Sequence, residues 1–323
     1  MRHLLRRISF YLFALWASIT INFIIPRLAP GDPAGAIMAR FQGRLTPSTL
    51  TALELQFGLS HDPLWVQYWQ YLFKLLHGDL GISFTYFPTP VAKVISQEIP
   101  WTLTLIGVAV TISFTLGTLL GIIVAWKRGS LLDSIVPPLL TFFSAIPYFW
   151  LALIALYLLA YTLNWFPLNG GYDTGTTIGW NFDFLASAIQ HAILPALTIV
   201  VASIAGWMLG MRNSMLTTLT EDYVLLAEAK GLSERRVVFA YAARNAVLPS
   251  VTGFALSLGF VVGGSLLTEV VFSYPGIGFA LLQGAQNSDY PLLQGIFLFI
   301  AVAVLGANFV ADLVYTLLDP RVR

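Results

Sequence analysis

The sequence predicts an all-α polytopic membrane protein, and its composition and hydropathy support this. Only 10% of the 323 residues are charged, 57% are hydrophobic, and the mean hydropathy is +0.76. A soluble domain carries about 25% charged residues. Apolar runs long enough to cross a bilayer recur from one end of the chain to the other. A chain this long with so few charges cannot cover its surface with polar groups, so lipid must be its solvent.

Six segments have the length of a spanning helix, about 20 apolar residues. They are Ile8–Ile25, Trp101–Trp126, Ser134–Leu163, Ala192–Met211, Val251–Phe272 and Leu292–Leu318. The first is longer than the apolar core of a signal peptide and is followed by Pro26-Arg27, so we interpret it as a retained span. The third contains Pro147, which should kink it by removing one backbone hydrogen bond.

Positive charge sets the predicted orientation, because cytoplasmic loops are enriched in Lys and Arg. The outer loops Asn164–Gln190 and Ser273–Pro291 contain no Lys or Arg. Lys127 and Arg128, and the basic group that begins at Arg212, should both be cytoplasmic. An even number of crossings must then separate the two groups. The fourth segment is one crossing, so the third segment counts as one span. Both termini are then cytoplasmic. The cytoplasmic segments hold twelve of the seventeen basic residues: Arg2, Arg6, Arg7, Lys127, Arg128, Arg212, Lys230, Arg235, Arg236, Arg244, Arg321 and Arg323.

The predicted domains are a first transmembrane helix with a basic N-terminus (1–29), an external helical segment (30–100), and a five-helix core (101–323) with a cytoplasmic loop (212–249). Inside the external segment, Thr46-Pro47 and Asp62-Pro63 are helix start signals, with stops at Gly58 and Gly78. Apolar residues recur at helical spacing from Leu64 to Leu76. This helix could pack on the bundle's own outer surface, which we favour, lie along the membrane interface, or support an external partner.

Several predicted spans carry a face of small or hydroxylated residues, such as Thr111, Thr115 and Gly117 in the second and Ser203, Gly206 and Gly210 in the fourth. Such faces serve helix packing in lipid, or line a weakly polar passage. No Asp, Glu, Lys or Arg lies at the centre of a predicted span, whereas ion-coupled carriers place ionisable groups there. The chain also has no Gly-x-x-x-x-Gly-Lys-Ser/Thr phosphate loop. If transport is active, its energy comes from a partner.

The sequence indicates no catalytic residue, metal site or cofactor in this chain. It has no cysteine, and its four histidines lie far apart without ligand spacing. The predicted spans contain no Ser/His/Asp set or paired carboxylates, which argues against an intramembrane enzyme. The net charge of +1 gives no reason to expect a nucleic-acid partner.

A polar segment, Glu221–Arg244, stands between two apolar spans. Its acids come early and its base late from Glu221 to Lys230, which suits a helix dipole. Gly231 can end that helix in the left-handed conformation, and Ser233 can cap a second helix. Two short helices joined at a glycine would make a compact docking surface for a soluble protein. A solvated, positively charged cytoplasmic loop explains the same residues equally well.

This segment resembles the cytoplasmic loop of binding-protein-dependent ABC importer permeases of the dipeptide/oligopeptide/nickel class. The similarity lies in Ala227–Gly231 and in Arg244–Pro249. The long external segment resembles that of the first of the two permease subunits. Two features depart from the family's general pattern: Leu225 replaces a glutamate, and the spacing from Gly231 to Leu248-Pro249 is longer. Five further stretches resemble the class and extend the match over the chain: Leu28–Pro33, Gly78–Ser83, Ala145–Trp150, Glu269–Gly278 and Asp319–Arg323.

The resemblance implies the transmembrane domain of a type I ABC importer, in a prokaryotic cytoplasmic membrane. Its partners would be a second, similar permease, two ATPase subunits that bind ATP and Mg²⁺, and an external substrate-binding protein. The cargo would be peptides, with oligosaccharides or nickel complexes as alternatives. The residues expected to dock on an ATPase are Glu221, Asp222, Tyr223, Ala227, Glu228, Ala229, Lys230, Gly231, Leu232, Ser233, Arg235 and Arg236.

Two other classes of protein remain as alternatives. A passive channel or facilitator would share the small-residue faces but would need no ATPase-docking loop, so the segment Glu221–Arg244 favours the importer. A membrane receptor would use the external segment to sense a ligand. Six spans with small-residue faces exceed what an anchor needs, so we rank the receptor last.

Overall fold

The computed structural model describes residues 2–28, 62–261 and 266–318. Helices dominate these residues, and the described part of the chain contains no strand beyond an isolated bridge between Ile82 and Pro90. The chain divides into two compact units. The first comprises residues 1–102, 262–266 and 275–323, and the second comprises 103–261 and 267–274.

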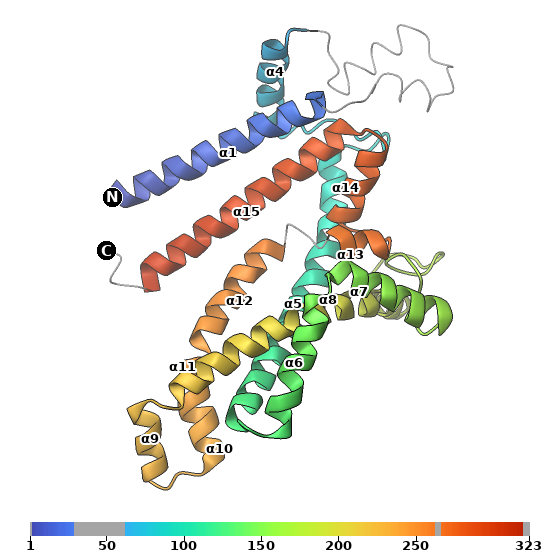
Figure 1. Cartoon of the computed structure of the whole chain (residues 1–323). Helices are drawn as coiled ribbons and strands as arrows, with labels where there is room; N and C mark the ends of the chain where they lie inside the picture. Colours follow the sequence, from blue (N-terminus) through green and yellow to red (C-terminus); the bar gives the residue numbers. More distant parts are fainter. Residues whose placement is uncertain (1, 29–61, 262–265, 319–323) are drawn as a thin grey trace. The chain divides into compact units, whose positions relative to one another are not determined.

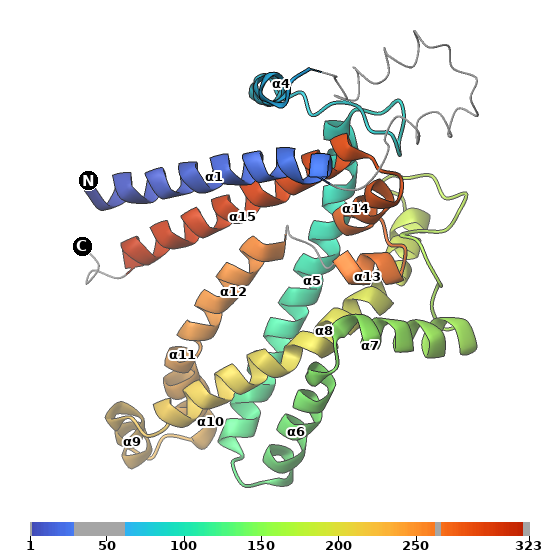
Figure 2. The same ribbon diagram turned by 45° about the horizontal axis from the view of Figure 1, so that its top comes forward.

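In the first unit, α1 (Arg2–Leu28) and α15 (Tyr290–Leu318) lie side by side and run antiparallel (Figures 1 and 2). The aromatic rings of Tyr11 and Phe309 meet near one end of the pair, with centroids 5.4 Å apart. Near the other end, the Asn22 amide donates to the Gln294 carbonyl at 2.6 Å. These helices cover the first and last predicted spans, and the start of α1 lies beside the end of α15.

The segment predicted to be external forms the helix that its sequence predicts. Helix α4 runs over Leu64–Leu76, directly after Asp62-Pro63, and ends beside Gly78, which adopts a φ of +73°. The loop after α4 is fixed by Asp289, a fully buried residue that accepts hydrogen bonds from the Ser83 hydroxyl (2.6 Å) and the Thr85 backbone N–H (2.7 Å). The helix expected near Thr46–Gly58 lies outside the described residues.

A small apolar core holds the rest of the first unit together. The beginning of α5 (Val91–Trp126) packs against α14 (Ile277–Gln286) and the first turns of α15. Helix α5 begins ten residues before the predicted span because its first turns are part of this core and not of the external loop. The core residues are Val91, Val94, Ile95, Ile277, Ala280, Leu292 and Ile296.

In the second unit, α5 and α8 (Phe182–Thr218) approach each other closely at two glycines. A Cβ added at Gly117 would lie 2.6 Å from the Cβ of Trp207, and one at Gly121 would lie 2.6 Å from the Met208 carbonyl oxygen. The Ser113 and Ser203 hydroxyls share a hydrogen bond of 2.8 Å across the same contact. These small residues therefore serve helix packing.

The third predicted span is two helices, not one kinked helix. Helix α6 (Leu131–Ala145) ends at Ile146, and α7 (Tyr148–Ala155) continues as a π-helix, η1 (Leu156–Thr162), at an angle of 92° to α6. Ile146 is extended, with ψ of 128°, as expected for a residue before proline. Pro147 has no N–H to donate to α6, so it begins a new helix.

The described residues of the fifth predicted span lie in α12 (Leu248–Phe260) and α13 (Leu266–Val271). By length and composition, three helical stretches among the described residues can cross a membrane, and the bent pair would make a fourth. These three are Val91–Trp126, Phe182–Thr218 and Tyr290–Val310, while Ser9–Ile25 and Leu248–Leu258 are shorter apolar stretches. The count of six spans and the sidedness of the termini remain predictions.

Candidate functional site

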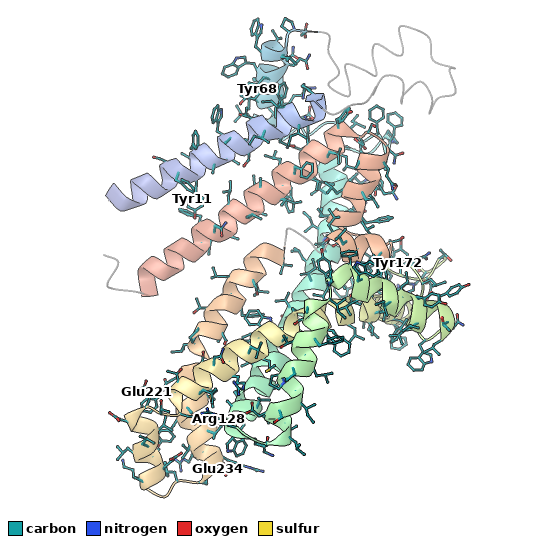
Figure 3. The ribbon with its side chains drawn as sticks, in the orientation of Figure 1. Tyr11, Tyr68, Arg128, Tyr172, Glu221 and Glu234 are labelled. Atoms are coloured by element: carbon teal, nitrogen blue, oxygen red, sulfur yellow. The ribbon has the colours of Figure 1, made fainter. Side chains whose placement is uncertain are left out.

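The polar segment folds into two short helices joined by a turn, and we call residues Glu221–Arg236 the docking loop. Helix α9 covers Asp222–Ala229, and α10 covers Glu234–Arg236. Figure 3 labels Glu221 and Glu234, at the start of each helix. The chain then continues through a π-helix, η2 (Val237–Ala242), and α11 (Ala243–Ala246) into α12.

The turn of the docking loop is a Schellman motif, in which a left-handed residue lets two N–H groups close the helix end. Gly231 has φ of +72°, and its N–H donates to the Glu228 carbonyl at 2.8 Å. The N–H of Leu232 reaches back to the Ala227 carbonyl at 3.4 Å. Ser233 occupies the cap position of α10, but its side chain makes no capping hydrogen bond, so the predicted capping by its hydroxyl is wrong.

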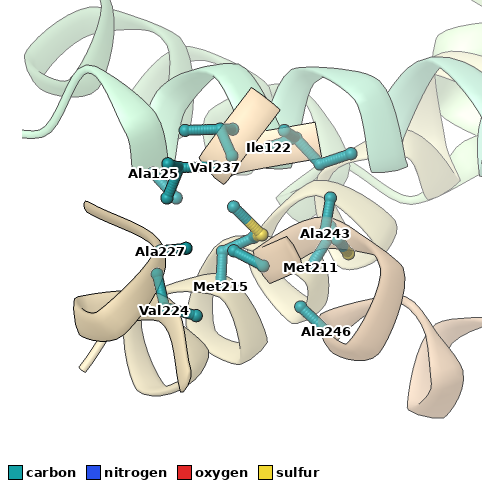
Figure 4. Packing of buried hydrophobic residues seen from close by; sticks show 11 residues of the cluster. Ile122, Ala125, Met211, Met215, Val224, Ala227, Val237, Ala243 and Ala246 are labelled. Atoms are coloured by element: carbon teal, nitrogen blue, oxygen red, sulfur yellow. The ribbon is translucent and has the colours of Figure 1, made fainter. Parts of the chain in front are cut away.

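The docking loop is anchored by a buried apolar cluster (Figure 4). Val224 and Ala227 insert the inner face of α9 into it, and Met211 and Met215 of α8 are fully buried beneath them. Because close-packed interiors transmit displacement, the loop and these helices should move as one body. The cluster consists of Ile122, Ala125, Met211, Met215, Val224, Ala227, Val237, Val238, Ala242, Ala243 and Ala246.

Polar contacts tie the same elements together at the surface. The Trp126 indole N–H, at the end of α5, donates to the Glu234 carboxylate of α10, and the Trp126 ring packs edge-on against Phe239. The Asn245 amide donates to the Tyr223 hydroxyl at 2.9 Å. The two helices of the docking loop are therefore each bonded to a different neighbouring element.

A partly buried ion pair links α8 to α6 close to the docking loop in sequence. The Arg212 guanidinium donates twice to one carboxylate oxygen of Asp133, at 2.9 and 2.8 Å. The other oxygen accepts the Gly129 N–H at 3.0 Å. Asp133 thereby fixes both the α5–α6 turn and the end of α8.

Most of the predicted docking residues form one exposed surface. Leu232 is half-buried, and Ala227 is only 2% exposed, so the Ala227 side chain packs inside the chain and not on this surface. The sequence analysis missed Leu225 and Leu226, which are 49% and 55% exposed and add an apolar patch among the charges. Their positions one and two residues after Val224 place them on the opposite face of a helix, but the pattern alone does not tell which of the two faces is exposed. The exposed predicted residues are Glu221, Asp222, Tyr223, Glu228, Ala229, Lys230, Gly231, Ser233, Arg235 and Arg236.

The exposed residues of the docking loop suit contact with a protein. Within residues 2–28, 62–261 and 266–318, no three or more His, Cys, Asp or Glu side chains are grouped so that they could hold a metal ion. The docking loop offers charges of both signs, two exposed leucines and attachment to the helices through its buried cluster.

Comparison with known proteins agrees with this description. Residues 117–323, which include the docking loop, match the family described as binding-protein-dependent transport system inner membrane component. The chain is 34% identical to the oligopeptide transport system permease protein AppB of Bacillus subtilis, over 99% of each chain. It is 37% identical to the di/tripeptide transport system permease protein DppB of Pseudomonas aeruginosa, over 98% of this chain and 97% of that protein.

The dipeptide transport system permease protein DppB of Escherichia coli is 33% identical over the whole of this chain and 99% of its own length. The helical architecture fits a membrane transport subunit. The chain therefore belongs to the inner-membrane permease family of binding-protein-dependent ABC transporters.

Proposed function

We propose that this chain is one of two permease subunits of an ATP-driven importer of di- or oligopeptides. The observation that carries the proposal is similarity over nearly the full length to proteins that are each named as peptide permeases. A second, similar permease would complete the passage, and an external binding protein would deliver the peptide. Selectivity would then lie mainly in the binding protein.

The docking loop would fit a groove on an ATPase subunit, which binds the ATP and Mg²⁺. Its charged and apolar exposed residues support a protein contact, and its buried cluster provides the mechanical connection. Closure of the ATPases would push the loop, and α5, α8 and α12 would follow it as a rigid body from an inward-facing to an outward-facing state. The chain itself would hydrolyse nothing.

In this proposal the chain crosses a prokaryotic cytoplasmic membrane six times, with both termini inside. The antiparallel pairing of α1 with α15 supports placing the termini on one side. The external segment and the loops 164–190 and 273–291 would then face the binding protein.

An exposed stripe on α8 is suited to line the passage. Gly206 and Gly210 have open space where a side chain would begin, and Asn213 and Thr217 continue the stripe by one helical turn each. This weakly polar face carries no charge, which suits a carrier that must release varied peptides. Ser203, one turn before Gly206, lies at the edge of this stripe, where its hydroxyl shares a hydrogen bond with that of Ser113 on α5.

The test is uptake of a labelled dipeptide and a labelled pentapeptide into proteoliposomes that contain the chain with its copurified partners and ATP. ATP-dependent uptake of either peptide that needs the binding protein supports the proposal. ATP-dependent uptake of an oligosaccharide or a nickel complex, but of neither peptide, would replace peptides as the proposed cargo. Uptake that proceeds equally without ATP would make the chain a passive facilitator and contradict the importer.

A further inference from the structure

Helix α4 presents a second apolar face that does not pack against α1. Its inner face meets α1 through Tyr68 and Tyr71, whose rings lie 5.1 and 5.5 Å from that of Phe23. Its other face is an aromatic stripe of Trp65, Trp69, Phe73 and Leu76, which are 65–85% exposed. The spacing of four, four and three residues keeps the stripe on one side of the helix.

A groove of about 920 Å³ runs between this stripe and the α1–α15 pair. Its floor is formed by Leu15 and Ile19 of α1 and by Leu298 and Val302 of α15, and α4 supplies the wall from Trp69 to Leu76. Its two polar side chains, Gln70 and Lys74, both come from α4. In Figures 1 and 2, α4 lies across α1 and not along it.

The residues of α15 that line the groove lie at the depth of one leaflet's acyl chains. Leu298 and Val302 follow Tyr290, the first residue of α15, by eight and twelve residues. At 1.5 Å per residue they lie about 12 and 18 Å below the end of the helix. Half the hydrocarbon thickness of a bilayer is about 15 Å. Trp and Tyr favour the boundary between hydrocarbon and headgroups, and α4 places Trp65 and Trp69 at this end.

We propose that the groove binds one phospholipid of the outer leaflet, with an acyl chain between α4, α1 and α15 and its phosphate at Lys74. This rests on the sidedness given under the proposed function. Charge complementarity selects the occupant: the Lys74 ammonium is the one charged group among the residues that line the groove, and it only donates. Gln70 is the other polar lining residue, and its amide N–H donates to Asp62 at 3.4 Å, while the remaining lining residues are apolar. The lipid would hold α4 against the two helices that carry the external segment.

Native mass spectrometry of the full chain, purified from its membrane in mild detergent with its copurified partners, tests the proposal by counting retained phospholipids. Val302→Trp fills the groove. Val310→Trp is the matched control, because both valines lie on α15 and are 49% and 59% exposed, and only Val302 lines the groove. We expect Val302→Trp to retain one phospholipid fewer per chain than the wild type, and Val310→Trp to retain the wild-type number.

A second variant tests the headgroup contact. Lys74→Gln, titrated with phosphatidylglycerol and with phosphatidylethanolamine, should bind both up to about fivefold more weakly, the range of an exposed ion pair. Unchanged binding of both lipids would contradict the assignment of Lys74.

Equal lipid counts in the two valine variants would overturn the proposal, because the retained lipids would then be annular. Loss of a second permease from the Val302→Trp sample, with the lipid count unchanged, would also overturn it and make the groove a protein interface. Lipid counting needs no ATP and no cargo. A failure of the lipid proposal can therefore be distinguished from a failure of the proposed peptide import.

Discussion

Gly231 is constrained by its backbone conformation and not by space. Its φ is +72°, and no heavy atom lies within 4 Å of an added Cβ. A left-handed conformation costs an ordinary L-residue about 1–2 kcal/mol, and asparagine less. We therefore expect Gly231→Asn to retain most ATP-driven uptake and Gly231→Val to lose much of it.

Gly231→Pro should abolish uptake while membrane insertion persists. Proline fixes φ near −65° and removes the N–H that donates to Glu228. Uptake per inserted permease, measured for all three variants in proteoliposomes, gives the comparison. Normal ATP-dependent uptake by Gly231→Pro would remove the docking assignment from this turn.

Trp126 joins the end of α5 to the docking loop through a single donor. Trp126→Phe keeps an aromatic ring against Phe239 but removes the N–H that binds Glu234. We expect the partner ATPases assembled with this variant to hydrolyse ATP at the usual rate, but the importer to take up about two- to fivefold less peptide per ATP, the range for loss of one exposed contact to a charged group. Glu234→Gln, which keeps an acceptor oxygen, should be milder. An unchanged ratio of peptide to ATP in both variants would show that the contact does not couple the two processes.

At the scale of elements, the contact between α5 and α8 depends on Gly121. A Cβ there would lie 2.6 Å from a backbone oxygen and 2.8 Å from the Met211 Cβ, neither of which can rotate away. Gly121→Ala should therefore destabilise the fold by about 1–3 kcal/mol, as overpacking does. Gly107→Ala is the control on the same helix, because nothing lies within 4 Å of its Cβ, and it should be neutral or stabilising by up to about 1 kcal/mol. Thermal unfolding of the purified variants in detergent measures both, and equal melting temperatures would contradict the close contact.

The elements with local start and stop signals were predictable from the sequence. Asp62-Pro63 and Gly78 bracket α4, and Gly231 ends α9, because proline, capping residues and left-handed glycines act on their own few neighbours. The family resemblance and the docking loop's helix boundaries followed from the same short-range patterns.

The bend between α6 and α7 and the choice of the buried face of α9 depend on contacts between residues on different elements. The sequence is apolar on both sides of Pro147, and the positive charges that flank the neighbouring spans predicted one span. Neither signal could give the 92° bend between α6 and α7. Helix α9 is too short for its buried face to be assigned by pattern alone. Whether Ala227 or Leu226 faces inward is decided by the methionines of α8, about a dozen residues away in sequence and on another helix.

At the scale of the whole molecule, the count of crossings depends on whether α6 and α7 together cross the bilayer or return to the side they came from. The chain has no cysteine, so single-cysteine variants report sidedness without background. Arg128 precedes α6, Trp180 follows η1 and is 96% exposed, and Ser233 is exposed in the docking loop. Six spans predict that an impermeant maleimide labels Trp180→Cys in sealed right-side-out vesicles. Arg128→Cys and Ser233→Cys should react only after permeabilisation.

Labelling of Arg128→Cys and Trp180→Cys from the same side would make the bent pair a re-entrant loop. The proposed sidedness of every segment before it would then be reversed relative to the docking loop, because α8 would be the only crossing left between Arg128 and Ser233.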